Sequence, residues 1–208
     1  MIFGTNRTLS PALALVLAFP AFTATLAAQT APPAVATYTI DPVHSSAEFK
    51  IKHLLVSTIS GQFDKVEGTV TLDTKAVAKS SVNVVIDTTS INTIGIGHDA
   101  RDKHLKSADF FDVETFPTIT FKSTSVKKVK DQLNVVGTFT MHGVTKTIEI
   151  PVTQEGPVAG MKPGSFVVGF NGNLKLNRSE YGMTKMIGPI GDEVTVTLNV
   201  EADLNPAN

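Results

Sequence analysis

Residues 47–55 read AEFKIKHLL, and this short stretch decides the fold class of the chain. Successive side chains of a β-strand point to opposite faces of the sheet, so residues two apart share a face. The charged face of the stretch holds Glu48, Lys50 and Lys52, and the mainly apolar face holds Ala47, Phe49, Ile51, His53 and Leu55. The stretch therefore predicts a strand with one buried side and one side in water.

The same alternation recurs along the rest of the chain. Its apolar phases are Gly68, Val70 and Leu72; Val82, Val84 and Ile86; Ile119 and Phe121; Leu133, Val135, Gly137 and Phe139; Phe166, Val168 and Phe170; and Val194, Val196, Leu198 and Val200. These runs indicate about eight or nine strands. Turn dipeptides separate the runs at Ser60-Gly61, Lys130-Asp131, His142-Gly143, Gly156-Pro157 and Pro163-Gly164. Short links favour antiparallel neighbours.

Two all-β architectures fit this pattern, a sandwich and a closed barrel. Several runs reach about ten residues, which is longer than an ordinary strand, and long strands in one sheet tend to curl and close. Glycines inside the runs, such as Gly68, Gly137 and Gly169, suit the bends of a curved sheet. We therefore expect an antiparallel β-barrel.

Residues 98–112, HDARDKHLKSADFFD, interrupt the alternation. The first half has acidic residues early and basic residues late, an order that complements a helix dipole. Ser107 is expected to cap a second helical turn, in which Phe110 and Phe111 need apolar cover. The segment predicts a short helical link that crosses an open end of the barrel.

The composition fits one globular domain. The chain has 208 residues, of which 42% are hydrophobic, and a formal net charge of -1. This charge balance argues against a nucleic-acid partner. No cysteine occurs in the sequence, so it predicts neither a disulfide framework nor a lipid-attachment cysteine.

The first 28 residues have the layout of a secretory signal peptide. Arg7 precedes an apolar centre, and small residues follow as far as Ala28. A retained membrane helix is the alternative, but Pro11 and Pro20 interrupt the apolar run. The expected organisation is a cleaved signal peptide over 1–28, a flexible spacer over 29–36 and one domain over 37–205, exported to the periplasm or secreted.

The motifs also resemble the YceI-like family of exported lipocalin-like proteins. The resemblance rests on YTIDPVHSSAEFKIKHL, GQFDKVEGTVTLD, HDARDKHLKSADFFDVETFPTITF, GTFTMHGVTKTI and NRSEYGM, which occur in this order between about Tyr38 and Leu204. It implies an extended eight-stranded antiparallel barrel whose apolar pocket holds a polyisoprenoid or another long-chain amphiphilic lipid. It provides no catalytic residues.

The histidines and hydroxyls do not form a recognisable catalytic or metal-binding motif. His98 and His104 are six residues apart, which places them on different faces of a helix. Ser45 and Ser46 follow His44, but neighbours in a strand point to opposite faces. The chain is therefore predicted to have no enzymatic activity, metal or cofactor. His53 shares the apolar phase, where it is either bonded to a wall hydroxyl or in contact with a ligand head group.

Whether the interior is hollow decides between two functions. Large inward side chains would fill it, whereas Ala47, Gly68 and Gly137 would leave space. A hollow barrel predicts a lipid-binding protein, with transient membrane contact and a homodimer as further interactions to consider; a filled barrel predicts an adaptor or stress-response protein with a protein partner. The expected ligand-binding residues are Phe49, Ile51, His53, Val70, Val84, Ile86, Phe110, Phe111, Phe121, Phe139, Phe170, Tyr181, Val196 and Leu198.

Overall fold

A computed structural model describes residues 31–93 and 97–205. The predicted signal peptide over residues 1–28 and the first two residues of the predicted spacer therefore lie outside the described residues. The strands of this part are β1 (Val35–Ile40), β2 (Ser46–His53), β3 (Ser57–Phe63), β4 (Val66–Asp73), β5 (Ser81–Asp87), β6 (Ile91–Thr93), β7 (Thr118–Val129), β8 (Gln132–Met141), β9 (Val144–Ala159), β10 (Phe166–Asn177) and β11 (Ile190–Leu204). The helices are α1 (His98–Lys106) and the short 3-10 helices η1 (Val77–Lys79), η2 (Thr88–Ser90) and η3 (Arg178–Tyr181).

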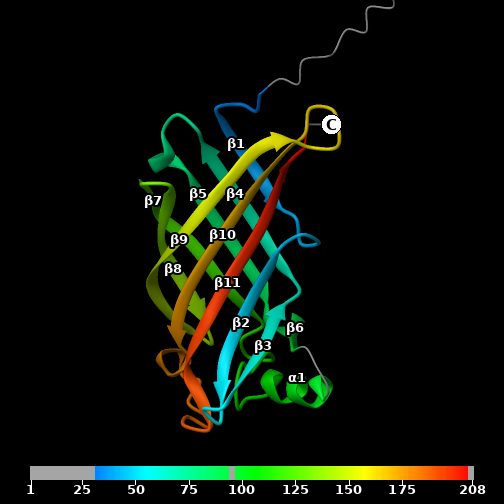
Figure 1. The fold of residues 1–208 in the computed structure, drawn as a ribbon, viewed down its shortest axis with the longest axis vertical. Coiled ribbons are helices and arrows are strands. Elements are labelled where there is room, and N and C mark those ends of the chain that lie inside the picture. Colours follow the sequence, from blue (N-terminus) through cyan, green and yellow to red (C-terminus); the bar gives the residue numbers. More distant parts are fainter. Residues whose placement is uncertain (1–30, 94–96, 206–208) are drawn as a thin grey trace, which may run out of the picture.

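Eight strands close into an antiparallel barrel (Figure 1). The ring runs β1-β4-β5-β7-β8-β9-β10-β11 and closes where Thr39 and Ile40 of β1 pair with Asp203 and Ala202 of β11. Strands β9 and β11 have 16 and 15 residues, far above the usual strand length of about five or six. The barrel is therefore tall, and the predicted all-β, extended eight-stranded lipocalin-like fold with a short helical segment is confirmed.

Strands β1 and β2 occupy successive places along β11. Strand β1 pairs with one end of β11, and β2 then pairs with its other part, from Asn199 opposite Ser46 to Val194 opposite Ile51. Strands β3 and β6 continue the sheet beyond β2. The wall at the end of the barrel that Figure 1 places at the bottom is thus formed partly by β2, β3 and β6; we call this the lower end.

One expected boundary and two expected turns were wrong. Strand β1 begins at Val35, so the last two residues of the expected spacer belong to the sheet, and Ala36 is buried against the core. The expected turn at Ser60-Gly61 lies inside β3, because Gly61 pairs with Phe49 across the hairpin. The expected turn at Gly156-Pro157 lies inside β9, near an irregularity in its pairing with β10.

The turn between β2 and β3 consists of Leu54, Leu55 and Val56 instead. Leu54 and Leu55 have positive φ angles of 50° and 61°, which reverse the chain directly after His53. Leu55 therefore does not share the inward face of β2, as the alternation predicted, and 78% of its surface is exposed. The alternation rule failed here because it applies only while the backbone stays extended.

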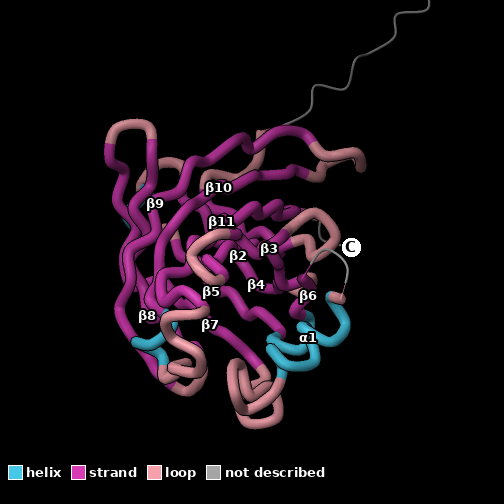
Figure 2. Tube along the Cα trace, turned by 60° about the horizontal axis from the view of Figure 1, so that its bottom comes forward, coloured by secondary structure: helices cyan, strands magenta, loops and turns pink. Residues whose placement is uncertain are grey.

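Helix α1 and the turns after it lie at the lower end beside β6 (Figure 2). Asp102 accepts hydrogen bonds from the backbone N–H and the hydroxyl of Thr93, which tie α1 to β6. The expected second helical turn is a series of hydrogen-bonded turns, in which the N–H groups of Phe110 and Asp112 bond the Ser107 carbonyl. Among the described residues no helix is both long and apolar enough to span a bilayer.

Candidate functional site

The lower half of the barrel encloses a cavity of about 250 Å³. Its wall is almost entirely apolar and comes from strands all around the barrel, from α1 and from the turns after α1. The predicted residues that line it are Phe49, Ile51, His53, Val84, Ile86, Phe110, Phe111, Phe121, Phe139, Val196 and Leu198. The alternation pattern therefore brought nine widely separated strand residues to one internal surface, and the helical link added Phe110 and Phe111.

A second apolar cavity of about 100 Å³ lies further along the barrel interior. Val70 and Phe170, which were also predicted, line this cavity rather than the larger one. The two cavities share five wall residues, namely Val84, Phe121, Ile150, Leu198 and Val200. One set of side chains borders both spaces inside the same barrel, so we call them the lower and upper chambers of the lumen.

The inward glycines do not create this space. A β-carbon on Gly137 would come within 2.6 Å of the Phe121 ring and 2.4 Å of the Lys122 carbonyl oxygen, so the ring covers the glycine. A β-carbon on Gly68 would meet the Asn83 carbonyl oxygen at 2.1 Å. The expectation that both glycines leave the lumen open was wrong, because each glycine allows close backbone or ring approach. Ala47, in contrast, lines the lower chamber.

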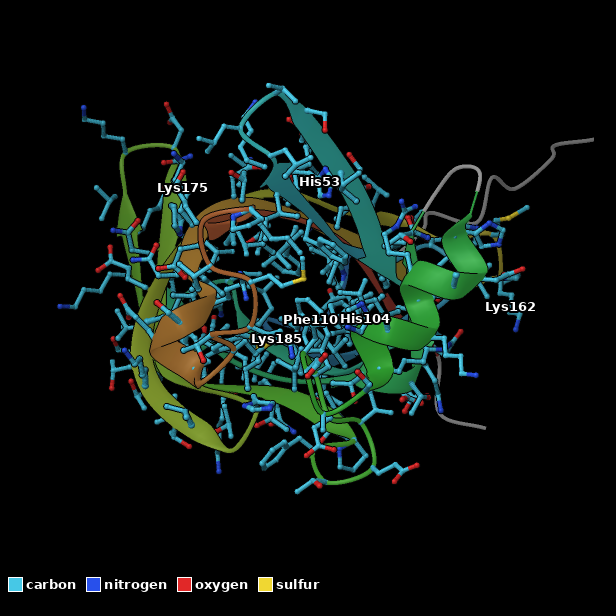
Figure 3. All side chains as sticks on the ribbon, turned by 90° about the horizontal axis from the view of Figure 1, so that it is seen from below. His53, His104, Phe110, Lys162, Lys175 and Lys185 are labelled. Atoms are coloured by element: carbon cyan, nitrogen blue, oxygen red, sulfur yellow. The ribbon has the colours of Figure 1, made fainter. Side chains whose placement is uncertain are left out.

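The segment that follows α1 closes one side of the lower chamber. The ring of Phe111 packs edge-on against Phe63 of β3, with 5.4 Å between ring centroids. Phe110 is buried and packs edge-on against His104 at 4.9 Å. Figure 3, viewed from below, shows Phe110 and His104 at this end together with His53 and Lys185. The helical link thus lies at the mouth of the lower chamber, as its sequence predicted.

Asp109 connects this link to the loop that precedes β11. Its carboxylate accepts from His104 Nε2 at 3.1 Å and, through the other oxygen, from Lys185 Nζ at 3.1 Å. The hydrogen bonds from His104 and then from Lys185 lower the pKa of Asp109. Asp109 is therefore ionised at neutral pH and forms a polar latch across the mouth.

Arg178 is a wall residue that sequence reasoning missed. Only 4% of its surface is exposed, and it donates to three backbone carbonyls: Nε to Gly191 at 2.8 Å, Nη1 to Met183 at 2.8 Å and Nη2 to Ile190 at 3.2 Å. Burial lowers the pKa of Arg178. Its position in NRSEYGM, directly after an alternating strand, was the signal that could have drawn attention to it. The arginine holds the loop between β10 and β11 in place.

His53 lines the lower chamber near its mouth, next to the turn at Leu54. Within residues 31–93 and 97–205, its ring has no hydrogen-bond partner. The first reading of His53, a ring bonded to a wall hydroxyl, is therefore wrong for the described part of the chain. The ring remains available to a polar group of a ligand.

Tyr181 occupies a different place from the one predicted. It is buried, packs edge-on against Phe139 at 5.5 Å, and does not line either chamber. Its backbone carbonyl lies 3.0 Å from His142 Nδ1, and Glu180 beside it pairs with Lys146 of β9. Tyr181 thus stands behind the chamber wall, in a short 3-10 helix that bridges to β9, and is not in contact with the lumen. Met183, two residues on, does line the lower chamber.

Asp41, His44 and Glu201 form an acidic cluster on the outer surface where β1 leads into β2. Their potential ligand atoms lie within 4.8 Å of one another. His44 Nδ1 is 2.7 Å from Asp41 Oδ2 and 3.8 Å from Glu201 Oε1. The hydrogen bond with Asp41 raises the pKa of His44 and lowers the pKa of Asp41. Ion pairing within the protein accounts for this geometry.

Together, the fold and the lumen define a class of protein: a small closed β-barrel with an apolar interior cavity. The family model described as the YceI-like domain matches residues 38–202. The chain therefore belongs to the YceI-like family, as the sequence motifs indicated.

Named relatives agree with this assignment. The UPF0312 protein YE1254 of Yersinia enterocolitica is 43% identical over 173 residues, which cover 80% of this chain and 85% of that protein. The crystal structure of Burkholderia cenocepacia BcnA has a TM-score of 0.69 at 26% identity and covers 78% of this chain and 99% of that one. A polyisoprenoid binding domain from Saccharophagus degradans has the same fold, with a TM-score of 0.62 at 17% identity over 82% of this chain and 99% of that one.

Proposed function

We propose that this protein binds a polyisoprenoid or a similar long-chain amphiphilic lipid, with the apolar chain in the lumen and the polar group near the mouth. The observation that carries the proposal is the lumen itself, because its two chambers share wall residues and are lined almost entirely by apolar side chains. An elongated apolar space suits a long, thin guest. The thirteen predicted residues on the chamber walls are the proposed contacts; Tyr181 is not one of them.

The size of the apolar contribution supports tight binding without many polar contacts. Burial of each CH₂ group contributes up to about 0.8 kcal/mol, so a five-carbon isoprene unit contributes at most about 4 kcal/mol before the costs of ordering the chain. Several units would therefore bind strongly. His53, at the mouth, offers a ring nitrogen to the polar end of the ligand.

The likeness to the Saccharophagus degradans domain is one of fold, and its printed description as a polyisoprenoid binding domain suggests the class of ligand to test first. The proposal includes export: residues 1–28 act as a signal peptide, and the mature protein carries its lipid through the periplasm or outside the cell. Sequestration and carriage of a lipid both need a soluble container, and neither needs a catalytic group.

The alternative function, an adaptor with a filled core that acts through a protein partner, has less support. A filled core does not fit a barrel with a 250 Å³ apolar chamber, since protein interiors seldom contain voids of this size unless they bind something. The lipid-binding function is therefore the one that we test.

The test measures lipid occupancy directly. The protein is purified without detergent after expression of the full coding sequence in a bacterial host, and native mass spectrometry is used to search for a hydrophobic mass that co-purifies. The protein is then stripped of lipid and titrated with farnesol and with geranylgeraniol, which has one more isoprene unit. We expect binding of both, with geranylgeraniol bound more tightly because it buries one more unit.

Two substitutions on one strand serve as the matched pair. Val196→Trp places a large ring in the lower chamber, whereas Thr195→Trp places the same ring on the opposite face of β11. Binding should be lost in the first variant and kept in the second. The proposal fails if neither alcohol binds and no lipid co-purifies, or if both substitutions have equal effects while the fold is retained.

A further inference from the structure

Two loops at the lower end expose an unusual number of large apolar side chains. In the β2–β3 turn, Leu54, Leu55 and Val56 are 56%, 78% and 85% exposed. In the loop before β11, Met186 and Ile187 are each 44% exposed. These five residues make up what we call the apolar lip. Contiguous apolar side chains on a surface mark a place of interaction, whereas single ones need no explanation.

The two loops form one surface beside the mouth. The Leu54 N–H donates to the Pro189 carbonyl at 2.6 Å, which joins the turn to the loop. The preceding pair, His53 and Ile190, are partners across β2 and β11, and both line the lower chamber. The lip is therefore the direct continuation of the chamber wall into solvent.

The backbone does not require apolar residues at these positions. Leu54, Leu55 and Met186 have positive φ angles of 50°, 61° and 55°. Glycine and asparagine adopt this region with less strain than leucine or methionine does. Folding alone would thus favour small or polar residues here, so the exposed leucines and methionine call for another reason.

The charges of the lip favour an anionic partner. The segment 49–63 contains Lys50 and Lys52 and no acidic residue, and the segment 181–191 contains Lys185 and no acidic residue. Lys185 pairs with Asp109 of the latch, whereas Lys50 and Lys52 are exposed on β2. Apolar side chains flanked by lysines are the combination by which peripheral proteins attach to the interface of an anionic bilayer.

We propose that the apolar lip inserts into the interface of a bilayer that contains anionic phospholipid, and that it thereby sets the mouth of the lumen against the membrane. The inference rests on the proposed function, because a lipid that leaves a membrane for the lumen passes through this mouth. The lip shortens the path through water by placing chamber wall and acyl chains next to each other.

The absence of tryptophan from the sequence makes a sharp test possible. Leu55→Trp places a single reporter on the lip, and Met161→Trp places one on a fully exposed residue of the β9–β10 loop at the opposite end. The variants are mixed with vesicles of equal parts phosphatidylcholine and phosphatidylglycerol. We expect a blue shift of the fluorescence and quenching by brominated acyl chains for Leu55→Trp only. No shift at Leu55→Trp, or an equal shift at both positions, would overturn the proposal.

A second pair of variants measures the contribution of the lip. Leu55→Asp introduces a residue type that tolerates a positive φ. Met161→Asp introduces the same residue at the far end. In vesicle flotation we expect Leu55→Asp to lower the affinity for the vesicles at least about tenfold, since a buried leucine is worth more than the free energy of one decade of affinity. Met161→Asp should bind like the parent protein. Thermal unfolding of both variants confirms that they are folded.

Geranylgeraniol added from ethanol separates this inference from the proposed function, because it reaches the lumen without a vesicle. If Leu55→Asp loses vesicle binding but takes up the alcohol like the parent protein, the result supports the proposal for the apolar lip. If the parent protein takes up the alcohol but does not bind vesicles, the proposal for the apolar lip is refuted and the proposed function stands. Vesicle binding through Leu55 without any uptake of the alcohol supports the lip and refutes the proposed function.

Discussion

The lower and upper chambers differ in both size and surroundings. The lower one measures about 250 Å³ and has His53, Arg101, His104 and Arg178 among its lining residues. The upper one measures about 100 Å³, and among the described residues its only polar lining residues are Ser80 and Ser81. Charged and ring-nitrogen groups thus gather at one end of the lumen. This difference supports the orientation in the proposed function, with the polar group of the ligand at the mouth and its chain end beyond the shared wall.

The largest effect is expected on the free energy of unfolding, when the buried charge of Arg178 at the mouth is removed. Arg178→Ala would leave the carbonyls of Met183, Ile190 and Gly191 without their donor. We expect the free energy of unfolding to fall by about 3 kcal/mol, because buried acceptors that lose a charged donor are costly. Urea unfolding followed by circular dichroism measures the change. The free energy of unfolding of Arg178→Lys should lie between that of the parent protein and that of Arg178→Ala. An unchanged value for Arg178→Ala would show that other contacts hold the mouth in place.

The next effect distinguishes short from long ligands. Val82 lines only the upper chamber, and Asn83 points outward from the same strand. Val82→Phe should weaken binding of geranylgeraniol by about tenfold, the value of roughly two lost CH₂ groups, and leave farnesol unaffected. Asn83→Phe should change neither affinity, as measured by native mass spectrometry. Equal losses for both alcohols would mean that the chambers do not divide the chain as proposed.

A smaller effect is expected at the polar latch. Asp109→Asn removes the carboxylate that joins His104 to Lys185, and the exposed position of this group implies little change in stability. We expect release of geranylgeraniol to quicken by about twofold to fivefold, given the modest strength of exposed ion pairs. Stopped-flow transfer to acceptor vesicles measures the rate. Glu193→Gln, which breaks the exposed pair with Lys175, is the control and should leave the rate unchanged.

The smallest effect concerns the link between β1 and β2, where the wall passes from one half of the barrel to the other. The hydrogen bond with Asp41 raises the pKa of His44 above 6.5. The stabilisation of the fold by protonated His44 is therefore complete below pH 6.5 and is lost as the pH rises through the raised pKa. The lowered pKa of Asp41 keeps its own contribution present above 3.8.

His44→Ala should therefore lower the melting temperature slightly near pH 5 and have no effect near pH 9. Melting curves of the variant and the parent protein at both pH values provide the measurement. A difference of the same size at both pH values would show that packing of His44, and not its charge, matters to the fold.

The sequence predicted the walls of the lumen better than its ends. Alternation placed Phe49, Val84 and Val196 correctly because each lies in an extended strand, where side-chain direction follows from position alone. It failed at Leu55, because the reversal at Leu54 depends on backbone angles that leucine rarely adopts.

Residues whose roles depend on contacts between elements were harder to predict. Arg178 begins the short helix η3, outside the alternating strands, and its partners are carbonyls that only the folded chain brings together. Gly137 was assigned the wrong role because the Phe121 ring that covers it comes from the neighbouring strand. Each of these positions depends on three-dimensional neighbours that no local pattern encodes.

The position of α1 beside β6 has a consequence for solubility. In the described part of the chain β6 pairs only with β3, so it is an edge strand with an unused row of backbone groups. Such an edge can recruit a strand from another molecule and start aggregation. Asp102 bonds the N–H of Thr93, and Arg101 Nε donates to the Thr93 hydroxyl at 2.7 Å. The helix therefore shields the edge of the sheet, and a barrel that lost this cover would tend to self-associate.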